Sequence, residues 1–254
     1  MIQARPVPQP VSGLRAWPAS AWRRRSEPRF RLNLALLATF LAASIAFTKV
    51  SEDYLDHDLI TRWDVDFSRW LHVHSSSALV SLFKIVTYGG NVAFLAVLTV
   101  AVVLFLLRRR AVEEAALVCV AALGIETINA VLKLGFHRPR PALSYVHLDT
   151  YSFPSGHAAG SAGIFAVLLY LVARHRRTLI RLGCAAAFVA IVAVIGFSRL
   201  YLEAHYLSDV LAGISLGIAW AAACLFVYEL LPGGPLTPRL PRRAVALLDR
   251  LAAD

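Results

Sequence analysis

The sequence predicts an all-α fold: a polytopic membrane helix bundle with six transmembrane helices. Of the 254 residues, 58% are hydrophobic and the mean hydropathy is +0.61, which is too apolar for a soluble domain of this length. Apolar runs close to membrane-spanning length recur along the chain, and short basic clusters separate several of them. Runs of this length fit helices, whose backbone hydrogen bonds are satisfied within each segment.

The N-terminal part is expected to be a tail followed by the first span. Residues 1–31 are rich in Pro and Arg, with seven Arg and one acidic residue, and we interpret them as a basic cytoplasmic tail. The apolar run Leu32–Thr48 follows directly. A cleaved signal peptide has a similar charged-then-apolar pattern, but no clear Ala-X-Ala site follows and more spans come later, so we favour an uncleaved helix.

Residues 50–78 are the most acidic part of the chain, and their acidic side chains are interleaved with Trp63 and Trp70. This pattern predicts an amphipathic segment at the membrane interface, with the Trp rings at headgroup depth. Leu79–Tyr88 is expected to extend the segment, and residues 89–91 (Gly-Gly-Asn) to end it.

Five later apolar runs complete the predicted bundle. They are Val92–Leu107, Ala111–Leu132, His157–Ala173, Leu182–Phe197 and Val210–Leu230. A polar loop, 133–156, joins the third and fourth spans. We expect one membrane domain, residues 32–230, and a cytoplasmic C-terminal tail, residues 231–254.

The basic residues predict the orientation of the bundle. With both termini in the cytoplasm, the inside segments hold 18 of the 26 Lys and Arg residues and the outside segments hold eight. This is a positive-inside distribution. It also accounts for the net charge of +10 without a nucleic-acid partner. The expected location is the inner (cytoplasmic) membrane, with membrane lipids as surroundings.

In this orientation three polar segments meet at the outer face: 133–141, 154–157 and 198–209. Lys133, Arg140 and Arg199 stand at two helix ends and in the loop between them. An Arg fork matches phosphate oxygens and Lys adds a point charge. The sequence therefore predicts an anion site for a phosphate-like group.

Ser155 and Gly156 precede the fourth span and are expected to add to this site. Ser155 is a candidate N-cap, the free N–H groups at a helix start bind anions, and Gly156 allows close approach of the backbone.

Two histidines are candidate catalytic groups. His205 and Asp209 are four residues apart, so on a helix they share a face. Asp209 is then able to accept the Nδ1 proton and leave Nε2 of His205 as a nucleophile. A purely structural His–Asp cap is the alternative. His157, at the start of the fourth span, is placed to protonate a leaving oxygen and later to activate water.

The pattern Lys-x6-Arg-Pro, Pro-Ser-Gly-His and Ser-Arg-x5-His-x3-Asp resembles the type 2 phosphatidic acid phosphatase (PAP2) superfamily, in its bacterial integral-membrane lipid phosphatase branch. The resemblance implies that His205 attacks phosphorus to form a phosphohistidine, that Asp209 orients it, and that His157 is the general acid and base. It also implies that the cations and the Ser155–Gly156 loop stabilise the phosphate oxygens without a metal.

Five further residues complete the expectations. Glu126 is expected to hold Lys133 or Arg199, or else to meet water at the helix end. Ser198 is expected to support the site, and Arg138 to contact substrate or a headgroup. His137 and His147 have no metal-ligand spacing with the other histidines, so no metal or cofactor is expected.

We therefore expect a membrane phosphatase of lipid phosphates or pyrophosphates. Candidate substrates are undecaprenyl pyrophosphate, phosphatidylglycerol phosphate, phosphatidic acid and lipid A phosphate, among which the motifs do not choose. A lipid phosphotransferase with the same site and a non-catalytic lipid-binding or transport bundle are the alternatives. The sequence does not indicate an oligomeric state.

Overall fold

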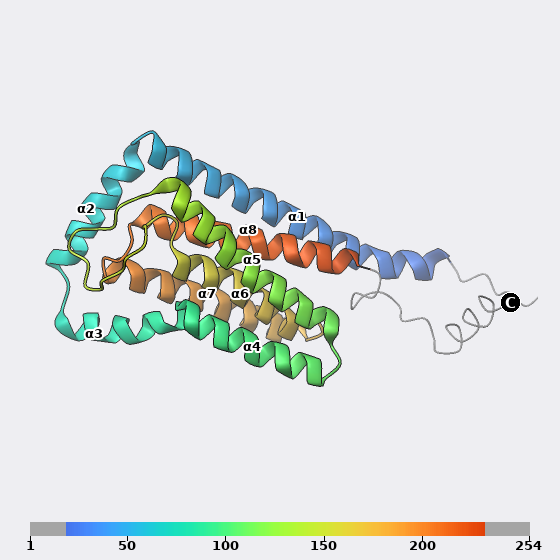
Figure 1. The fold of residues 1–254 in the computed structure, drawn as a ribbon. Coiled ribbons are helices and arrows are strands. Elements are labelled where there is room, and N and C mark those ends of the chain that lie inside the picture. The colour runs from blue at the N-terminus through green and yellow to red at the C-terminus, as the bar shows by residue number, and fades with distance from the viewer. Residues whose placement is uncertain (1–18, 232–254) are drawn as a thin grey trace, which may run out of the picture.

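A computed structural model describes residues 19–231, which form helices and loops only (Figure 1). The helices are α1 (Ala19–Leu55), α2 (Leu59–Val73), α3 (Ser77–Val86), the short 3-10 helix η1 (Thr87–Gly90), α4 (Val92–Arg108), α5 (Val112–Phe136), α6 (Gly156–Ala173), α7 (Thr178–Tyr201) and α8 (Leu207–Leu230). The all-α bundle expected from the sequence is confirmed.

The described residues contain five helices that are each long and apolar enough to cross a membrane. Residues 77–90 and 92–108 form a sixth span if the two helical segments, which meet at a bend of 41°, are counted as one. The bend lies at Asn91, which caps α4 by accepting a hydrogen bond from the N–H of Ala93 at 2.8 Å. The six apolar runs thus lie in α1 and α4–α8, as predicted.

The first helix is longer than the apolar run that predicted it. It begins at Ala19, within the segment expected to be a tail, and ends at Leu55. The sequence from residue 19 to 25 is rich in Ala and Arg, which are good helix formers, so the helix extends beyond the apolar stretch. Residues 1–18 and 232–254, which hold the rest of both expected tails, lie outside the described residues.

Helices α6 and α8 pack closely enough that glycine is required at their contact. A Cβ atom on Gly213 would lie 2.5 Å from the carbonyl oxygen of Ser155 and 3.0 Å from Cβ of Ala158. One turn further along, a Cβ on Gly217 would collide with the carbonyl oxygen of Ala159. This contact therefore sets the position of the α6 N-terminus relative to α8.

The two ends of the bundle differ (Figure 1). The α4–α5 and α6–α7 turns and the end of α8 lie at one end, near the start of α1. At the other end, helix α2 and the loop 137–155 lie across the bundle. They cover the ends of α5, α6, α7 and α8 there. Helix α2 is amphipathic, as expected, with Leu71 buried and Trp63 and Trp70 exposed.

Candidate active site

The loop 137–155 folds back over the end of α5 and positions two of the predicted cations. Lys133, in the last turn of α5, donates a hydrogen bond from Nζ to the carbonyl oxygen of Tyr151. Arg140 donates from Nε to the carbonyl oxygen of Thr150 at 2.7 Å and from Nη2 to its hydroxyl oxygen at 2.9 Å. Both cations thus donate hydrogen bonds to uncharged groups of the loop 137–155.

The start of α6 supplies free N–H groups beside these cations. Ser155 occupies the N-cap position, and its backbone N–H donates to the carbonyl oxygen of Asp209 at 3.0 Å. We had expected its hydroxyl to cap the helix. Instead, the hydroxyl is buried with no hydrogen-bond partner in the described chain. The first N–H groups of the helix lack intrahelical acceptors. A Cβ on Gly156 would lie 2.9 Å from the side-chain amide of Asn129, so a larger residue there would crowd the site.

Arg199 lies in the last turn of α7 and is only 2% exposed. Its Nη1 donates to the hydroxyl oxygen of Thr87 in η1 at 2.8 Å. Its Nε and Nη2 have no hydrogen-bond partner among the described residues. A buried guanidinium with unused donors is costly unless an acceptor such as an anion meets them.

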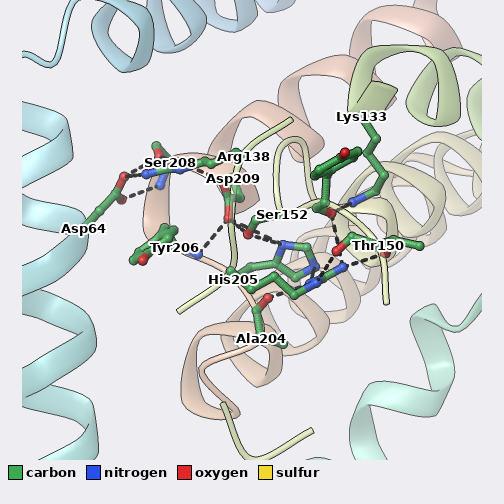
Figure 2. Close-up of polar contacts among 12 residues, drawn as sticks. Asp64, Lys133, Arg138, Thr150, Ser152, Ala204, His205, Tyr206, Ser208 and Asp209 are labelled. Carbon is green, nitrogen blue, oxygen red and sulfur yellow. Dashed lines mark hydrogen bonds and ion pairs between the residues drawn. The ribbon is translucent and has the colours of Figure 1, made fainter. Parts of the chain in front are cut away.

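His205 lies in the loop before α8, not on the helix as the spacing had suggested. Helix α8 begins after it because Asp209 accepts a hydrogen bond from the N–H of Tyr206 at 2.8 Å and so caps the first turn. Asp209 Oδ2 nevertheless faces His205, at 3.5 Å from Nδ1 (Figure 2). The hydroxyl of Ser152 donates to the same Oδ2 and lies 3.4 Å from Nδ1.

The contacts of His205 define its tautomer. Nη1 of Arg140 lies 3.1 Å from Nε2 of His205, and because a guanidinium only donates, Nε2 is the acceptor. The ring proton therefore sits on Nδ1, towards Asp209 and Ser152. Burial and the positive charges of Arg199, Arg140 and Lys133 hold the pKa of His205 well below its usual range. The ring is thus neutral, with a lone pair on Nε2.

His157 is in the first turn of α6, against η1. A Cβ atom on Gly90 would lie 3.3 Å from Cβ of His157. The ring makes no hydrogen bond to a described residue, and it lies within electrostatic range of Arg199, His205 and Arg140. The structure therefore brings His157 to the same site as His205.

The site carries an excess of positive charge. Arg138 is neutralised by two carboxylates, Asp209 and Asp64, each at 2.7 Å. Lys133, Arg140 and Arg199 form no ion pair with a carboxylate anywhere in residues 29–231. Three cations around a neutral histidine leave the site complementary to a multiply charged anion.

Sequence reasoning missed Asp64, Arg138, Ser152 and Thr150. Arg138 was expected to contact substrate or a headgroup, but it is buried and fully engaged with protein groups. Asp64 was assigned only to an amphipathic segment at the membrane interface, although it lies three residues from Phe67 and seven from Leu71. That spacing puts a carboxylate on the apolar face of α2, which was the signal for a buried ion pair.

Two supporting residues make no hydrogen bond to the cations within the described residues. Glu126 forms no ion pair with Lys133 or Arg199; its carboxylate lies instead beside Gly160 of α6, where a Cβ would be 2.8 Å from Oε1. The hydroxyl of Ser198 donates to the carbonyl oxygen of Ile195, 2.6 Å away in its own helix.

The comparisons with known proteins agree with this geometry. Residues 114–231 match the model of the PAP2 superfamily, and this range contains all three predicted segments. The region of residues 114–231 is therefore similar to the PAP2 superfamily. It contains nearly all of α5 and the whole of α6, α7 and α8, while α2 and its carboxylate Asp64 lie before it.

Two curated PAP2 relatives share the sequence of this region. Phosphatidylglycerophosphatase B of Bacillus subtilis is 37% identical over 94 residues, which are 36% of this chain and 46% of the relative. A lipid A 1-phosphatase of Rhizobium johnstonii is 37% identical over 107 residues, which are 39% of this chain and 40% of the relative. The chain thus spans under half the length of these relatives.

Two solved PAP2 structures share the fold. A transmembrane PAP2-type phosphatidylglycerolphosphate phosphatase from Bacillus subtilis superposes with a TM-score of 0.66 at 24% identity, covering 77% of this chain and 97% of that one. Aquifex aeolicus LpxE gives a TM-score of 0.51 at 24% identity, covering 64% and 94%. The helical fold is therefore shared with these two solved structures, and the protein is a multi-pass membrane protein.

Proposed function

We propose that the protein is an integral membrane phosphatase that hydrolyses lipid phosphates or pyrophosphates through a phosphohistidine on His205. One observation carries the proposal: within the part of the chain that the structure describes, Lys133, Arg140 and Arg199 have no carboxylate partner, and they surround a neutral histidine. Uncompensated cations with free donors fit the charge that spreads over the phosphoryl oxygens in the transition state.

In the first step, the Nε2 lone pair of His205 attacks phosphorus. The bond from phosphorus to the ester or bridging oxygen breaks, and that oxygen takes a proton from His157. The products are a phosphohistidine and the free lipid alcohol or lipid monophosphate. Asp209 stabilises the positively charged ring of His205 by accepting a hydrogen bond from the Nδ1–H of that ring.

In the second step, His157 accepts a proton from a water molecule whose oxygen attacks phosphorus. The phosphorus–nitrogen bond breaks, its electron pair returns to Nε2, and inorganic phosphate leaves. The cations supply the charge stabilisation throughout, so the proposed reaction uses no metal.

We place the site on the outer face of the inner (cytoplasmic) membrane. The basic turns 108–110 and 174–181 lie at the end of the bundle opposite α2 and the site (Figure 1), as expected if that end is cytoplasmic. A lipid substrate would keep its chains in the bilayer and reach the cations with its phosphate. The names of the relatives support phosphatidylglycerol phosphate and lipid A phosphate among the candidates.

The test is phosphate release by purified protein from a panel of lipid phosphates and pyrophosphates, with His205→Ala as the blank. Release by the native protein but not by the variant is expected, with and without a chelator. Activity that survives in His205→Ala would overturn the nucleophile assignment and leave a binding or transport bundle. Transfer of phosphate to an added lipid alcohol in place of water would instead indicate a phosphotransferase.

A further inference from the structure

Asp64 is a buried carboxylate on a helix that otherwise belongs to the membrane surface. It is 1% exposed, whereas Trp63 and Trp70 of the same helix are more than half exposed. Burying a carboxylate is costly unless charges and hydrogen bonds compensate it. The partners of Asp64 therefore indicate what the residue does.

Those partners belong to the catalytic end of the bundle (Figure 2). Oδ2 of Asp64 accepts a hydrogen bond from Nη2 of Arg138 at 2.7 Å. Oδ1 accepts from the backbone N–H of Ser208 at 2.8 Å, and the Ser208 hydroxyl donates to Oδ2. Asp64 thus joins α2 to the loop 137–155 and to the first turn of α8.

Arg138 passes this connection on to Asp209. Its Nη1 donates to Oδ1 of Asp209 at 2.7 Å and to the hydroxyl of Ser208 at 2.6 Å. The guanidinium lies over the rings of Tyr54 and Tyr206, 4.4 Å from each ring centroid. Burial opposes the charge, but Asp209 and Asp64 raise the pKa of Arg138.

Asp209 uses its two oxygens for different partners. Oδ1 accepts from Arg138, while Oδ2 faces Nδ1 of His205 at 3.5 Å and accepts from Tyr206 and Ser152. The direction of Oδ2 towards His205 depends on where Oδ1 is held. A chain of contacts therefore runs from Asp64 through Arg138 and Asp209 to the nucleophile.

We propose that Asp64 is a positioning residue for His205, acting through Arg138 and Asp209. It fixes Arg138 in the plane that aims Asp209 at Nδ1 and so keeps Nε2 of His205 as the free nucleophilic nitrogen. This proposal rests on the proposed phosphatase function. It assigns a role to α2, which lies outside the three motif segments and before the PAP2 match.

A positioning role for Asp64 should affect kcat, whereas a phosphate-binding role should also affect KM. Arg138 is compensated by two carboxylates, in contrast to Lys133, Arg140 and Arg199, so loss of Asp64 does not remove a phosphate ligand. We expect Asp64→Asn to lower kcat about 10- to 100-fold, as loss of an outer partner of a catalytic group commonly does, with little change in KM. Asp66→Asn is the matched control, because Asp66 is exposed on the same helix and should leave kcat unchanged.

A double variant separates positioning from folding. Asp64→Asn leaves part of the Arg138 charge uncompensated, which by itself can impair folding. Asp64→Asn combined with Arg138→Gln removes both charges. If Asp64 acts through Arg138, the loss of kcat in the double variant equals that of Arg138→Gln alone and is smaller than the product of the two single losses.

The tautomer of His205 gives a readout that does not need turnover. Nitrogen NMR of selectively labelled histidine, with His205 assigned by its loss in His205→Ala, should show an Nδ1–H ring in the native protein. We expect a smaller Nδ1–H population in Asp64→Asn and no change in Asp66→Asn.

The outcomes keep this proposal apart from the proposed function. Native kcat together with an unchanged His205 tautomer in Asp64→Asn would overturn the positioning role while the phosphatase function stands. A loss of activity that only follows loss of folded protein, with the tautomer intact, would overturn it as well. If the native protein releases no phosphate, the phosphatase function fails, and the tautomer measurement still decides whether Asp64 orients His205.

Discussion

Nη1 of Arg140 donates a hydrogen bond to Nε2 of His205 across 3.1 Å. The proposed nucleophilic nitrogen and a proposed phosphate ligand are thus already in contact. An arriving phosphoryl group must take this donor onto one of its oxygens, which frees the lone pair of Nε2 as the phosphorus approaches. Binding and activation of the nucleophile are therefore coupled at one guanidinium.

Replacing Arg140 should test this coupling. Arg140→Lys keeps a positive charge but cannot bond Thr150, Tyr151 and His205 with one planar fork. We expect kcat/KM for a lipid phosphate to fall by about a hundredfold to a thousandfold, as for loss of a transition-state donor elsewhere. Arg62→Lys, on the exposed face of α2, is the control and should match the native protein. Native kinetics in Arg140→Lys would argue against the coupling.

The pH below which activity falls should be lower than the ordinary pKa of histidine. The folded pKa of His205 is lowered, so the ring stays neutral as the pH falls past about 6.5, the usual histidine pKa, and becomes protonated only at lower pH. Because the pKa of His205 is lower in the folded state than in the unfolded state, the unfolded state binds a proton first as the pH falls. The free energy of unfolding therefore decreases as the pH falls below about 6.5. Titration of the His205 NMR signal is the direct measurement, and a midpoint near 6.5 would contradict it.

The contact between α6 and α8 predicts an effect on both stability and activity. Gly213→Ala places a methyl group 2.5 Å from the carbonyl oxygen of Ser155, which forces the helices apart. We expect a loss of about 1–3 kcal/mol in the free energy of unfolding, seen as a lower Tm, and reduced activity because the start of α6 shifts. Gly183→Ala is the control, since nothing lies within 4 Å of a Cβ there. Equal Tm values for the two variants would contradict the close packing.

The proposed orientation can be tested by cysteine labelling. The side chain of His147 in the loop 137–155 is 94% exposed, and Arg109 lies in the turn between α4 and α5. After the native cysteines are replaced by alanine, a membrane-impermeant maleimide should label His147→Cys on intact cells and Arg109→Cys only after permeabilisation. The reverse pattern would place the site in the cytoplasm and overturn the charge-based orientation.

Much of the site was predictable because its residues sit at fixed offsets around apolar runs. The spacing of Lys133 and Arg140, and the helix start at Gly156, follow from local rules of helix ends and turns. The Asp64–Arg138 pair was not predictable in this way. Its two residues are 74 positions apart. The spacing of Asp64 from Phe67 and Leu71 indicates that its carboxylate is buried, but it does not indicate which cation the carboxylate meets.

Hydropathy and motif spacing were enough to predict the membrane-spanning runs, the segments that meet at one end, and the residue types of an anion site with two histidines. Hydropathy and helix-end chemistry act over a few residues, so they can be read along the chain. The folded structure was needed to show that His205 precedes α8, that Arg138 is neutralised and Arg199 is not, and that Asp64 connects to His205 through two partners. These depend on which charges packing brings within about 3 Å of one another, and that is a property of the folded bundle.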